Sequence, residues 1–332
     1  MARDPVAFER ALLAHIESLG PKPVLLPMEE ATIRWLTDRA EVVAEHAHFL
    51  IPGRKSLMVA LDKGKTFEAA AQGGIPAPHT ELPEDPAALA RAVAKLEGGA
   101  FVVKPRAGSG SAGVVYGEHR NEDAWRAHWE RYGPLIVQQR VPPEGRAVGV
   151  ACLFDGSGDL KARFSHQRLK QYPVGGGPST DREAVHEPQL EAWSEALLRS
   201  LDWRGVAMVE WKQDPATGGF RLLEINPRFW GSLELAVRAG VDFPSLYARA
   251  ALGEKIPESF EYQNGVRCRW MVPGDVLRYL SDPSRGSLRS FLKGGVHLAE
   301  EWDPSDKRGA LATIVCTGAL ALNPRYWRYV RR

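Results

Sequence analysis

The chain has 332 residues, of which 44% are apolar and 25% are charged, and its formal net charge is +2. This length supports a sizeable core and exceeds that of one average domain, while the near-neutral charge gives no electrostatic reason to expect a nucleic-acid partner. The three cysteines are scattered and form no CxxC pair. They argue against a disulfide framework or a structural zinc site, and they predict a reducing, cytoplasmic location.

The N-terminal part of the chain alternates between helical and extended patterns. Helical spacing covers residues 4–20, 29–46 and 56–74, and short apolar stretches at 22–27 and 47–52 separate these helices. Such alternation is typical of an open parallel sheet. An opening strand with a glycine turn is missing, so we expect a shortened Rossmann-like lobe. The first segment is amphipathic and carries acids, which is not typical of a signal peptide.

The middle of the chain is rich in strands that are grouped as hairpins, which indicates an α/β (α+β) fold. Helices are expected at residues 85–98, 121–133 and 187–202, with Asp85 and Asn121 as caps. Strands are expected at 100–105, 112–117, 134–141, 146–155, 160–172 and in a hairpin over 206–227.

Two segments carry less definite patterns. Residues 172–183 read "YPVGGGPSTDRE", which we interpret as a substrate-covering loop or a mobile connection. The apolar run at 310–322 is too short to span a bilayer, so we expect no transmembrane segment in the chain. We interpret it as a core element followed by a solvated end, with an interfacial membrane contact as the alternative.

The stretch "RLLEINPRFWGS" carries the first functional signal. Alternate residues of a strand share a face, so Glu224, Asn226 and Arg228 are expected to point the same way. Leu223 and Ile225 are then expected on the opposite face. A lone carboxylate in such an apolar setting is costly to bury without a partner.

A second carboxylate is expected opposite the first. If the hairpin is symmetric about Thr217, Glu210 lies opposite Glu224, with the two residues about 5 Å apart. Two carboxylates at this separation repel each other unless a cation lies between them. With the Asn226 amide oxygen they form a set of hard oxygen ligands that suits magnesium bound together with a nucleotide's phosphates. The alternative is an exposed edge hairpin with solvated acids.

A glycine-rich loop follows the strand at 100–105. Gly108, Gly110 and Gly113 match the dinucleotide-binding fingerprint formally, but that fingerprint must open a helix at once, and here a strand pattern follows. A glycine loop between two strands can instead fold over phosphates and offer backbone N–H groups. Lys104, at the end of the preceding strand, would add a cation. A plain hairpin turn is the alternative.

Together these features resemble the ATP-grasp superfamily over about residues 63–253. The resemblance rests on the order of "DKGKTFEAAAQGGIPAPHT", "FVVKP", the glycine loop, "LIVQQRV", "FSHQRLK", "VEW" and "LLEINPRF". It implies the ATP-grasp fold, with a nucleotide held between two antiparallel-sheet lobes. The implied organisation is a partial Rossmann-like lobe (1–64), a small lobe with the glycine loop (65–137), a large lobe with the metal site (138–260) and a C-terminal extension (261–332).

The resemblance also implies roles for individual residues. The nucleotide would be held by Lys63 and Lys104 at its phosphates, the loop glycines Gly108, Gly110 and Gly113 above them, the hinge residues Gln138, Gln139 and Val141 at adenine, and Glu144 at the ribose. The magnesium ligands would be Glu210, Glu224 and Asn226. Arg228 would hold the transferring phosphate and the acyl intermediate, and Arg168 would lie near the carboxylate substrate.

The activity that this resemblance implies is ATP-dependent ligation. ATP with Mg²⁺ (or Mn²⁺) would convert a small-molecule carboxylate into an acyl phosphate, release ADP, and let an amine displace phosphate. Two alternatives stay open: activation of bicarbonate by a carboxylase or carbamoyl-phosphate-type enzyme, and a catalytically silent nucleotide-binding partner protein. The shortened first lobe also leaves room for a homodimer or a partner chain that completes it.

Overall fold

The computed structural model describes residues 5–96, 100–108, 113–117, 121–173, 177–281, 298–303 and 305–321. Its helices are α1 (Pro5–Ser18), α2 (Glu30–Asp38), α3 (Ala40–His46), α4 (Arg54–Leu61), α5 (Lys63–Gln72), α6 (Pro86–Lys95), α7 (Glu122–Tyr132), α8 (Pro188–Ser200), α9 (Leu233–Arg238), α10 (Phe243–Ala251), the π-helix η1 (Met271–Asp275), α11 (Val276–Ser281) and α13 (Lys307–Ala321). Its strands are β1 (Thr80–Glu81), β2 (Phe101–Pro105), β3 (Val115–Tyr116), β4 (Leu135–Gln139), β5 (Ala147–Phe154), β6 (Leu160–Gln171), β7 (Ser179–Ala184), β8 (Gly205–Gln213), β9 (Phe220–Asn226) and β10 (Arg267–Arg269).

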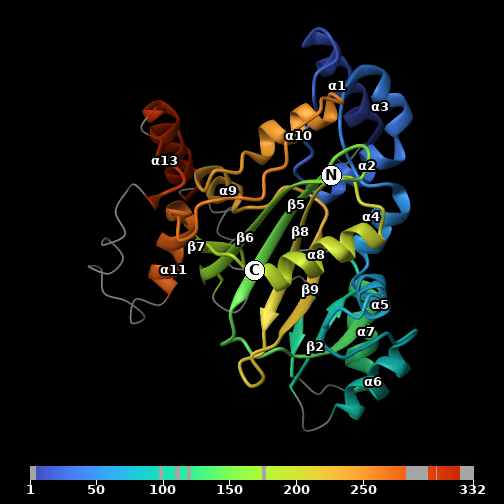
Figure 1. Ribbon diagram of the computed structural model, residues 1–332. Helices are drawn as coiled ribbons and strands as arrows, with labels where there is room; N and C mark the ends of the chain where they lie inside the picture. The colour runs from blue at the N-terminus through green and yellow to red at the C-terminus, as the bar shows by residue number, and fades with distance from the viewer. Residues whose placement is uncertain are drawn as a thin grey trace.

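The strands form two sheets in which every pairing between named strands is antiparallel. The small sheet has the order β1-β4-β2-β3, and the large sheet has the order β10-β7-β6-β5-β8-β9. Figure 1 shows the large sheet at the centre of the molecule and the small lobe, marked by β2, α6 and α7, below it. The prediction of two antiparallel-sheet lobes is therefore confirmed.

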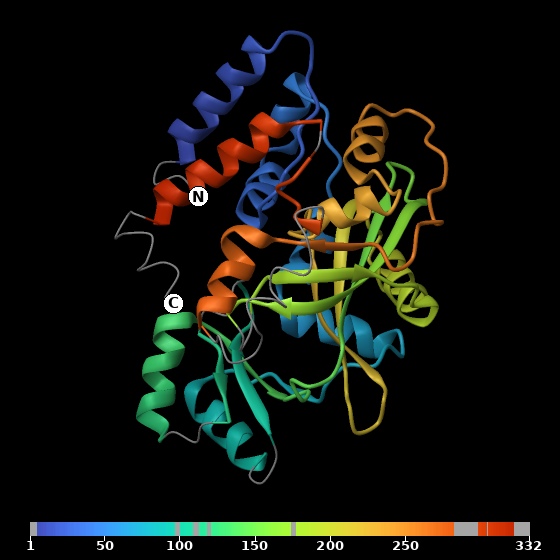
Figure 2. The same cartoon turned by 90° about the vertical axis from the view of Figure 1, so that its left-hand side faces the viewer.

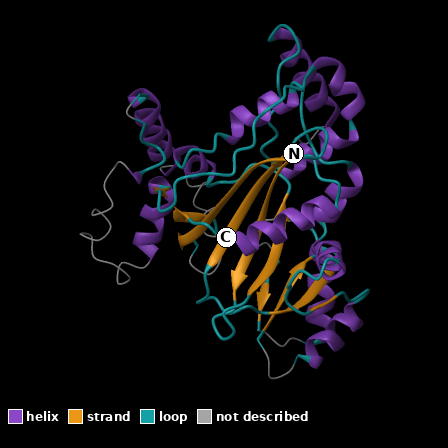
Figure 3. Ribbon diagram, viewed as in Figure 1, coloured by secondary structure: helices purple, strands orange, loops and turns teal. Residues whose placement is uncertain are grey.

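Helices cover both faces of the large sheet (Figure 3). One face packs against α8 through apolar side chains such as Leu197 and Val209, and this cluster extends to Phe67 of α5. The other face packs against α9 and α10, where Phe243 and Tyr247 meet Phe164 of β6. Side chains alternate along each strand, so both faces are apolar over the part that the helices cover.

The small lobe follows its sequence signals closely. The Asp85 side chain accepts a hydrogen bond from the amide of Ala88 and caps α6, and the Asn121 side chain accepts one from Ala124 and caps α7. Both caps were expected from the sequence. Leu89 and Trp125 then bury the inner faces of these helices against the small sheet.

The N-terminal lobe differs from the expected parallel sheet. Among the described residues, the two short apolar stretches join only through a parallel bridge between Val24 and His48. The long helix expected at 29–46 is divided into α2 and α3 around Arg39, and that expected at 56–74 is divided at Asp62. The lobe is thus mainly helical, because two strands of a few residues give too little pairing to build a sheet.

The hairpin of β8 and β9 has the expected pairing at its functional end and a different register beyond it. Glu210 lies opposite Glu224, as predicted, but Trp211 lies opposite Leu222. Leu223 is the extra residue of this β-bulge. Leu222 and Ile225, three residues apart, therefore both enter the core under α8, and the expectation that Leu223 shares a face with Ile225 is wrong.

Two further expectations need correction. Residues 179–184 form β7 rather than part of a loop, and residues 174–176 of the glycine-rich segment lie outside the described residues.

In α13, Leu311 and Val315 are 61% and 60% exposed, so this helix is not a core element. Figure 2 turns α11 and α13 towards the viewer. Within the described part of the chain, no helix is both long and apolar enough to cross a membrane.

One hydroxyl makes two of the contacts that join the N-terminal lobe to the large lobe. The Tyr247 hydroxyl of α10 accepts a hydrogen bond from the Leu50 amide at 2.9 Å and donates one to the Leu25 carbonyl at 3.3 Å. Tyr247→Phe keeps the buried ring and removes both bonds. We expect it to lower the free energy of unfolding by about 1–3 kcal/mol in urea titrations. Tyr116→Phe, at an exposed tyrosine of β3, is the control; equal effects of the two changes would contradict this tether.

Candidate active site

The expected carboxylate pair lies on the face of the large sheet that also carries α9 and α10. Glu210 of β8 and Glu224 of β9 are cross-strand partners, and the Asn226 amide donates to Glu210 Oε1 at 3.3 Å. Burial is the largest influence on Glu210 and raises the pKa of its carboxyl, and the nearby Glu224 carboxylate raises it further. The Arg168 guanidinium acts in the opposite direction. The sheet thus brings the three predicted metal ligands together.

Cations surround this pair on both sides. Arg168 of β6 forms an ion pair with Glu210 at 3.0 Å, and Lys63, the first residue of α5, lies 3.7 Å from Glu224. The Arg228 guanidinium donates to Asn226 Oδ1 at 3.4 Å. Charge on the two carboxylates is therefore balanced by cations from β6, from α5 and from the segment just after β9, which offsets part of the cost of burying them.

Lys104 completes the cationic side of the site from the small lobe. Its ammonium lies 5.5 Å from the centre of the Phe67 ring. Burial is the largest influence and lowers the pKa of Lys104 to about 8, with Glu224 raising it and Lys63 lowering it. Lys104 and Lys63 thus both act on the Glu224 carboxylate, from different lobes.

The base of the glycine loop is fixed by contacts that the sequence did not reveal. Lys63 Nζ donates to the Gly108 carbonyl at 2.8 Å. Arg106 pairs with both oxygens of Asp62, at 3.0 and 2.9 Å, and Asp62 in turn caps α5. No sequence signal pointed to this pair, because Asp62 lay inside the single helix expected at 56–74.

The glycines of the loop have different surroundings. Gly113 has φ +73°, and a Cβ there would lie 2.8 Å from the Tyr132 ring, so glycine is required. Gly108 has φ +108° and open space around it. Gly110 lies outside the described residues. The loop joins the antiparallel strands β2 and β3, as predicted.

The expected hinge lies between the lobes, at the end of β4. The Gln138 side chain is buried and donates a hydrogen bond to Thr80 Oγ1 at 2.7 Å, so it links β4 to β1 within the small sheet. The Gln139 amide donates to the His79 carbonyl. Val141 is half-buried and Glu144 is exposed.

Two more residues near the site were missed at the sequence level. Glu30, the first residue of α2, lies 3.7 Å from the Arg228 guanidinium and brings the N-terminal lobe to the site. His166 lies two residues before Arg168 on the same strand face, and its Nε2 is 2.9 Å from the Ser232 hydroxyl. Burial, and then the charges of Arg168 and Arg182, lower the pKa of His166 to about 3, so its imidazole is neutral.

The donor set fits a divalent cation that completes its shell elsewhere. No cluster of three or more His, Cys, Asp or Glu side chains suited to a metal occurs in the described ranges. Two carboxylates and an amide are too few ligands to enclose a cation alone, yet they match the needs of magnesium, which is usually held by one or two carboxylates and by substrate phosphates.

Comparisons with known proteins bear on the family and the fold. Residues 134–272 match the family described as "ATP-grasp in the biosynthetic pathway with Ter operon". Acetyl-CoA carboxylase 1 of Arabidopsis thaliana is 27% identical over 207 residues, which are 59% of this chain and 8% of that protein. The chain therefore spans a small part of this relative's length.

Solved structures show the same fold. The biotin carboxylase of Campylobacter jejuni, crystallised in a complex with ATP, aligns with TM-score 0.65 and 15% identity over 78% of this chain and 60% of its own. The biotin carboxylase domain of the Hydrogenobacter thermophilus 2-oxoglutarate carboxylase, crystallised as a dimer with MgADP and bicarbonate, aligns with TM-score 0.64 and 16% identity over the same shares. The chain has the ATP-grasp fold.

The balance of charges around Lys104 can be tested without substrate. Because the Glu224 carboxylate favours the charged ammonium, Glu224→Gln is expected to lower the pKa of Lys104 further. Lys63→Met removes a like charge and is expected to raise it. NMR titration of ¹³C-methylated lysines measures both. If the pKa of Lys104 were the same in both variants as in the wild-type protein, the ammonium of Lys104 would not interact with Glu224 and Lys63.

Proposed function

We propose that the chain is an ATP-dependent ligase that activates a carboxylate as an acyl phosphate with release of ADP. The observation that carries the proposal is the convergence of Glu210, Glu224 and Asn226 with cations from both lobes. One side of the acid pair faces Lys63 and Lys104, and the other faces Arg168 and Arg228. Such a strip of alternating charge suits a polyphosphate on one side and a carboxylate on the other.

Each group has a definite task in this proposal. Lys63 and Lys104 bind the phosphates of ATP, and the loop that begins at Gly108 covers them. Glu210, Glu224 and Asn226 would hold magnesium, which supplies positive charge to the terminal phosphates. The hinge from Gln138 to Val141 receives adenine, with Glu144 near the ribose.

Arg168 and Arg228 orient the reacting acid. Arg228 is held by the Asn226 amide oxygen and the Phe229 carbonyl, so its guanidinium is fixed beside the metal ligands. A carboxylate held by these two arginines is positioned to attack the γ-phosphorus in line, and the cations stabilise the charge that develops on the transferring group. An amine then displaces phosphate from the acyl phosphate, without a side-chain nucleophile.

Activation of bicarbonate is a second candidate. The relatives and neighbours named above are carboxylases, and one neighbour was crystallised with bicarbonate. Bicarbonate would occupy the same place between Arg168 and Arg228. ADP release that depends on bicarbonate, and on no other carboxylate in a screen, would favour this candidate. The cytoplasmic location and a second chain that completes the N-terminal lobe stay predictions.

The metal ligands can be tested by removing one charge. Glu224→Gln keeps the size of the side chain but binds a cation less well, so we expect magnesium-dependent ADP release to fall by about a hundredfold or more. Glu210→Gln is expected to behave alike. Glu258→Gln, at an exposed acid, is the matched control. Wild-type turnover in a well-folded Glu224→Gln protein would contradict the metal site.

The intermediate can be trapped. With the true acid substrate, hydroxylamine should give a hydroxamate together with ADP, and a carboxylate labelled with heavy oxygen should pass the label to inorganic phosphate. Arg228→Ala should abolish this label transfer and leave ATP binding largely intact, because its partner is the transferring group. Release of AMP and pyrophosphate would overturn the mechanism, since it would indicate an acyl adenylate.

A further inference from the structure

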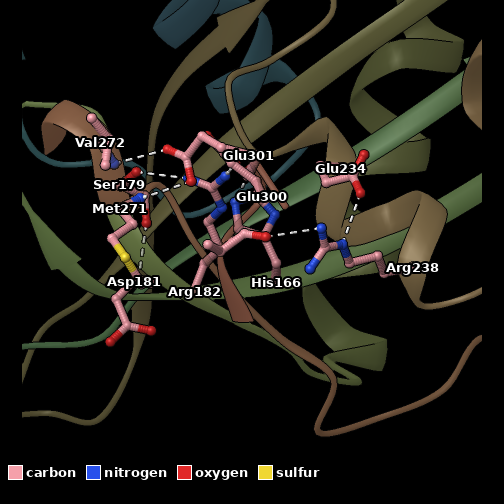
Figure 4. Close-up of polar contacts among 12 residues, drawn as sticks. His166, Ser179, Asp181, Arg182, Glu234, Arg238, Met271, Val272, Glu300 and Glu301 are labelled. Atoms are coloured by element: carbon pink, nitrogen blue, oxygen red, sulfur yellow. Dashed lines mark hydrogen bonds and ion pairs between the residues drawn. The ribbon is translucent and has the colours of Figure 1, made fainter. Parts of the chain in front are cut away.

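A second cationic group lies beside the proposed site, on β7. Arg182 is 1% exposed and is directly opposite Arg168 of β6 in the sheet. Like charges at directly opposed positions destabilise a sheet unless anions compensate them. Arg168 has Glu210, but the neighbour of Arg182 in the chain, Asp181, points away from it in Figure 4 and pairs with Arg267 and Lys170.

One edge of the Arg182 guanidinium is incompletely bonded. Nη1 donates to the Ser179 carbonyl at 2.8 Å, and Nη2 meets Glu300 in an ion pair. Nε, on the same edge as Nη2, has no hydrogen-bond partner among the described residues. Nε and Nη2 are two parallel donors, the arrangement that one carboxylate fills with two hydrogen bonds.

A neutral imidazole adjoins this edge. His166 lies on the same strand face as Arg168 and next to Arg182 in Figure 4. Its ring packs so closely over Gly149 that a Cβ there would lie 2.5 Å from His166 Cε1. Nε2 is engaged with Ser232, whereas the buried Nδ1 has no hydrogen-bond partner within the described ranges. Arg182 Nε and His166 Nδ1 are thus both buried without a hydrogen-bond partner among the described residues, beside the proposed site.

The acid at this position comes from the C-terminal extension. Glu300 is held by its main chain, because its amide donates to the Arg269 carbonyl at 2.8 Å. Glu301, the next residue, accepts hydrogen bonds from the amides of Met271 and Val272 at 3.3 and 2.9 Å. The segment is thus anchored on η1 and β10, and the Glu300 side chain reaches Arg182 from outside the large sheet (Figure 4).

We propose that Arg182 binds a carboxylate of the second substrate, the attacking amine, and that Glu300 occupies the position of this carboxylate here. The inference rests on the proposed function and adds the chemical class of the nucleophile, an amino acid. Register places Arg182 one strand beyond Arg168, on the far side from Glu210. An amine bound through its carboxylate at Arg182 would therefore lie next to an acyl phosphate held at Arg168 and Arg228.

Glu300 then acts as an intramolecular competitor. Its carboxylate compensates Arg182 until a substrate carboxylate with two well-formed hydrogen bonds displaces it. Release of Glu300 would loosen the segment 299–302 and expose the amides of Met271 and Val272 that Glu301 covers. Binding of the nucleophile is thereby coupled to the C-terminal extension.

The test compares nucleophiles with and without a carboxylate. Using the acid substrate identified by hydroxamate trapping, ADP release is measured with hydroxylamine, with a mixture of the common L-amino acids and with the corresponding amino-acid amides. Wild-type protein should prefer the acids to the amides. Arg182→Gln should reduce this preference by about ten- to a hundredfold, which corresponds to the loss of a charged hydrogen bond, and should affect hydroxylamine much less.

Glu300→Gln provides an independent variant on the surface side of the pair. It should lower KM for the acids several-fold and leave KM for the amides unchanged, because only the acids compete with Glu300. Glu301→Gln is the matched control, since its amide oxygen can still accept the bonds from Met271 and Val272. Saturating L-amino acids should also speed hydrogen exchange at residues 299–302 and 271–272 in the wild-type protein.

The outcomes separate the two proposals. Absence of any hydroxamate in the wild type would reject the proposed function. Hydroxamate formation without a preference for acids over amides, or an unchanged KM in Glu300→Gln, would overturn the role of Arg182 and leave the proposed function intact.

Discussion

The opposition of Glu210 and Glu224 is the constraint on which the site depends. The hairpin of β8 and β9 places two carboxylates side by side on a largely covered face of the sheet. Their repulsion has to be offset, and in the structure each is approached by a cation from another element: Arg168 from β6 and Lys63 from α5. The β-bulge at Leu223 then lets the same strand return apolar side chains to the core.

The same charge balance joins the lobes. Lys104 comes from the small sheet and is influenced by Glu224 of the large sheet, while Arg228 of the large lobe lies near Glu30 of the N-terminal lobe. The elements around the site are therefore held in part by interactions that an anionic ligand would also make. Such interactions can be exchanged for ligand contacts without a large loss of stability, because one anion replaces another.

Arg106 fixes the position of the first residues of the glycine loop. Its bidentate pair with Asp62 fixes the start of the loop to the N-terminus of α5, directly beside Lys63. The start of the loop is therefore anchored at Arg106 and Gly108, beside Lys63. Arg182 and Glu300 give the opposite side of the site a comparable anchor, in this instance from the C-terminal extension.

The sequence alone determined the features that depend on near neighbours. Alternation along β9 placed Glu224 and Asn226 together, turn chemistry set Glu210 opposite, and the caps Asp85 and Asn121 began their helices, because these depend on backbone geometry within a few residues. The order of motifs predicted the two antiparallel lobes.

Tertiary structure decided the rest. The contacts of Glu30 with Arg228, Arg106 with Asp62 and Glu300 with Arg182 join segments that are far apart in the chain. No local pattern encodes them, since they follow from how lobes pack. The strand β7 was hidden for the same reason: its polar residues suit a strand only because distant charged groups compensate them.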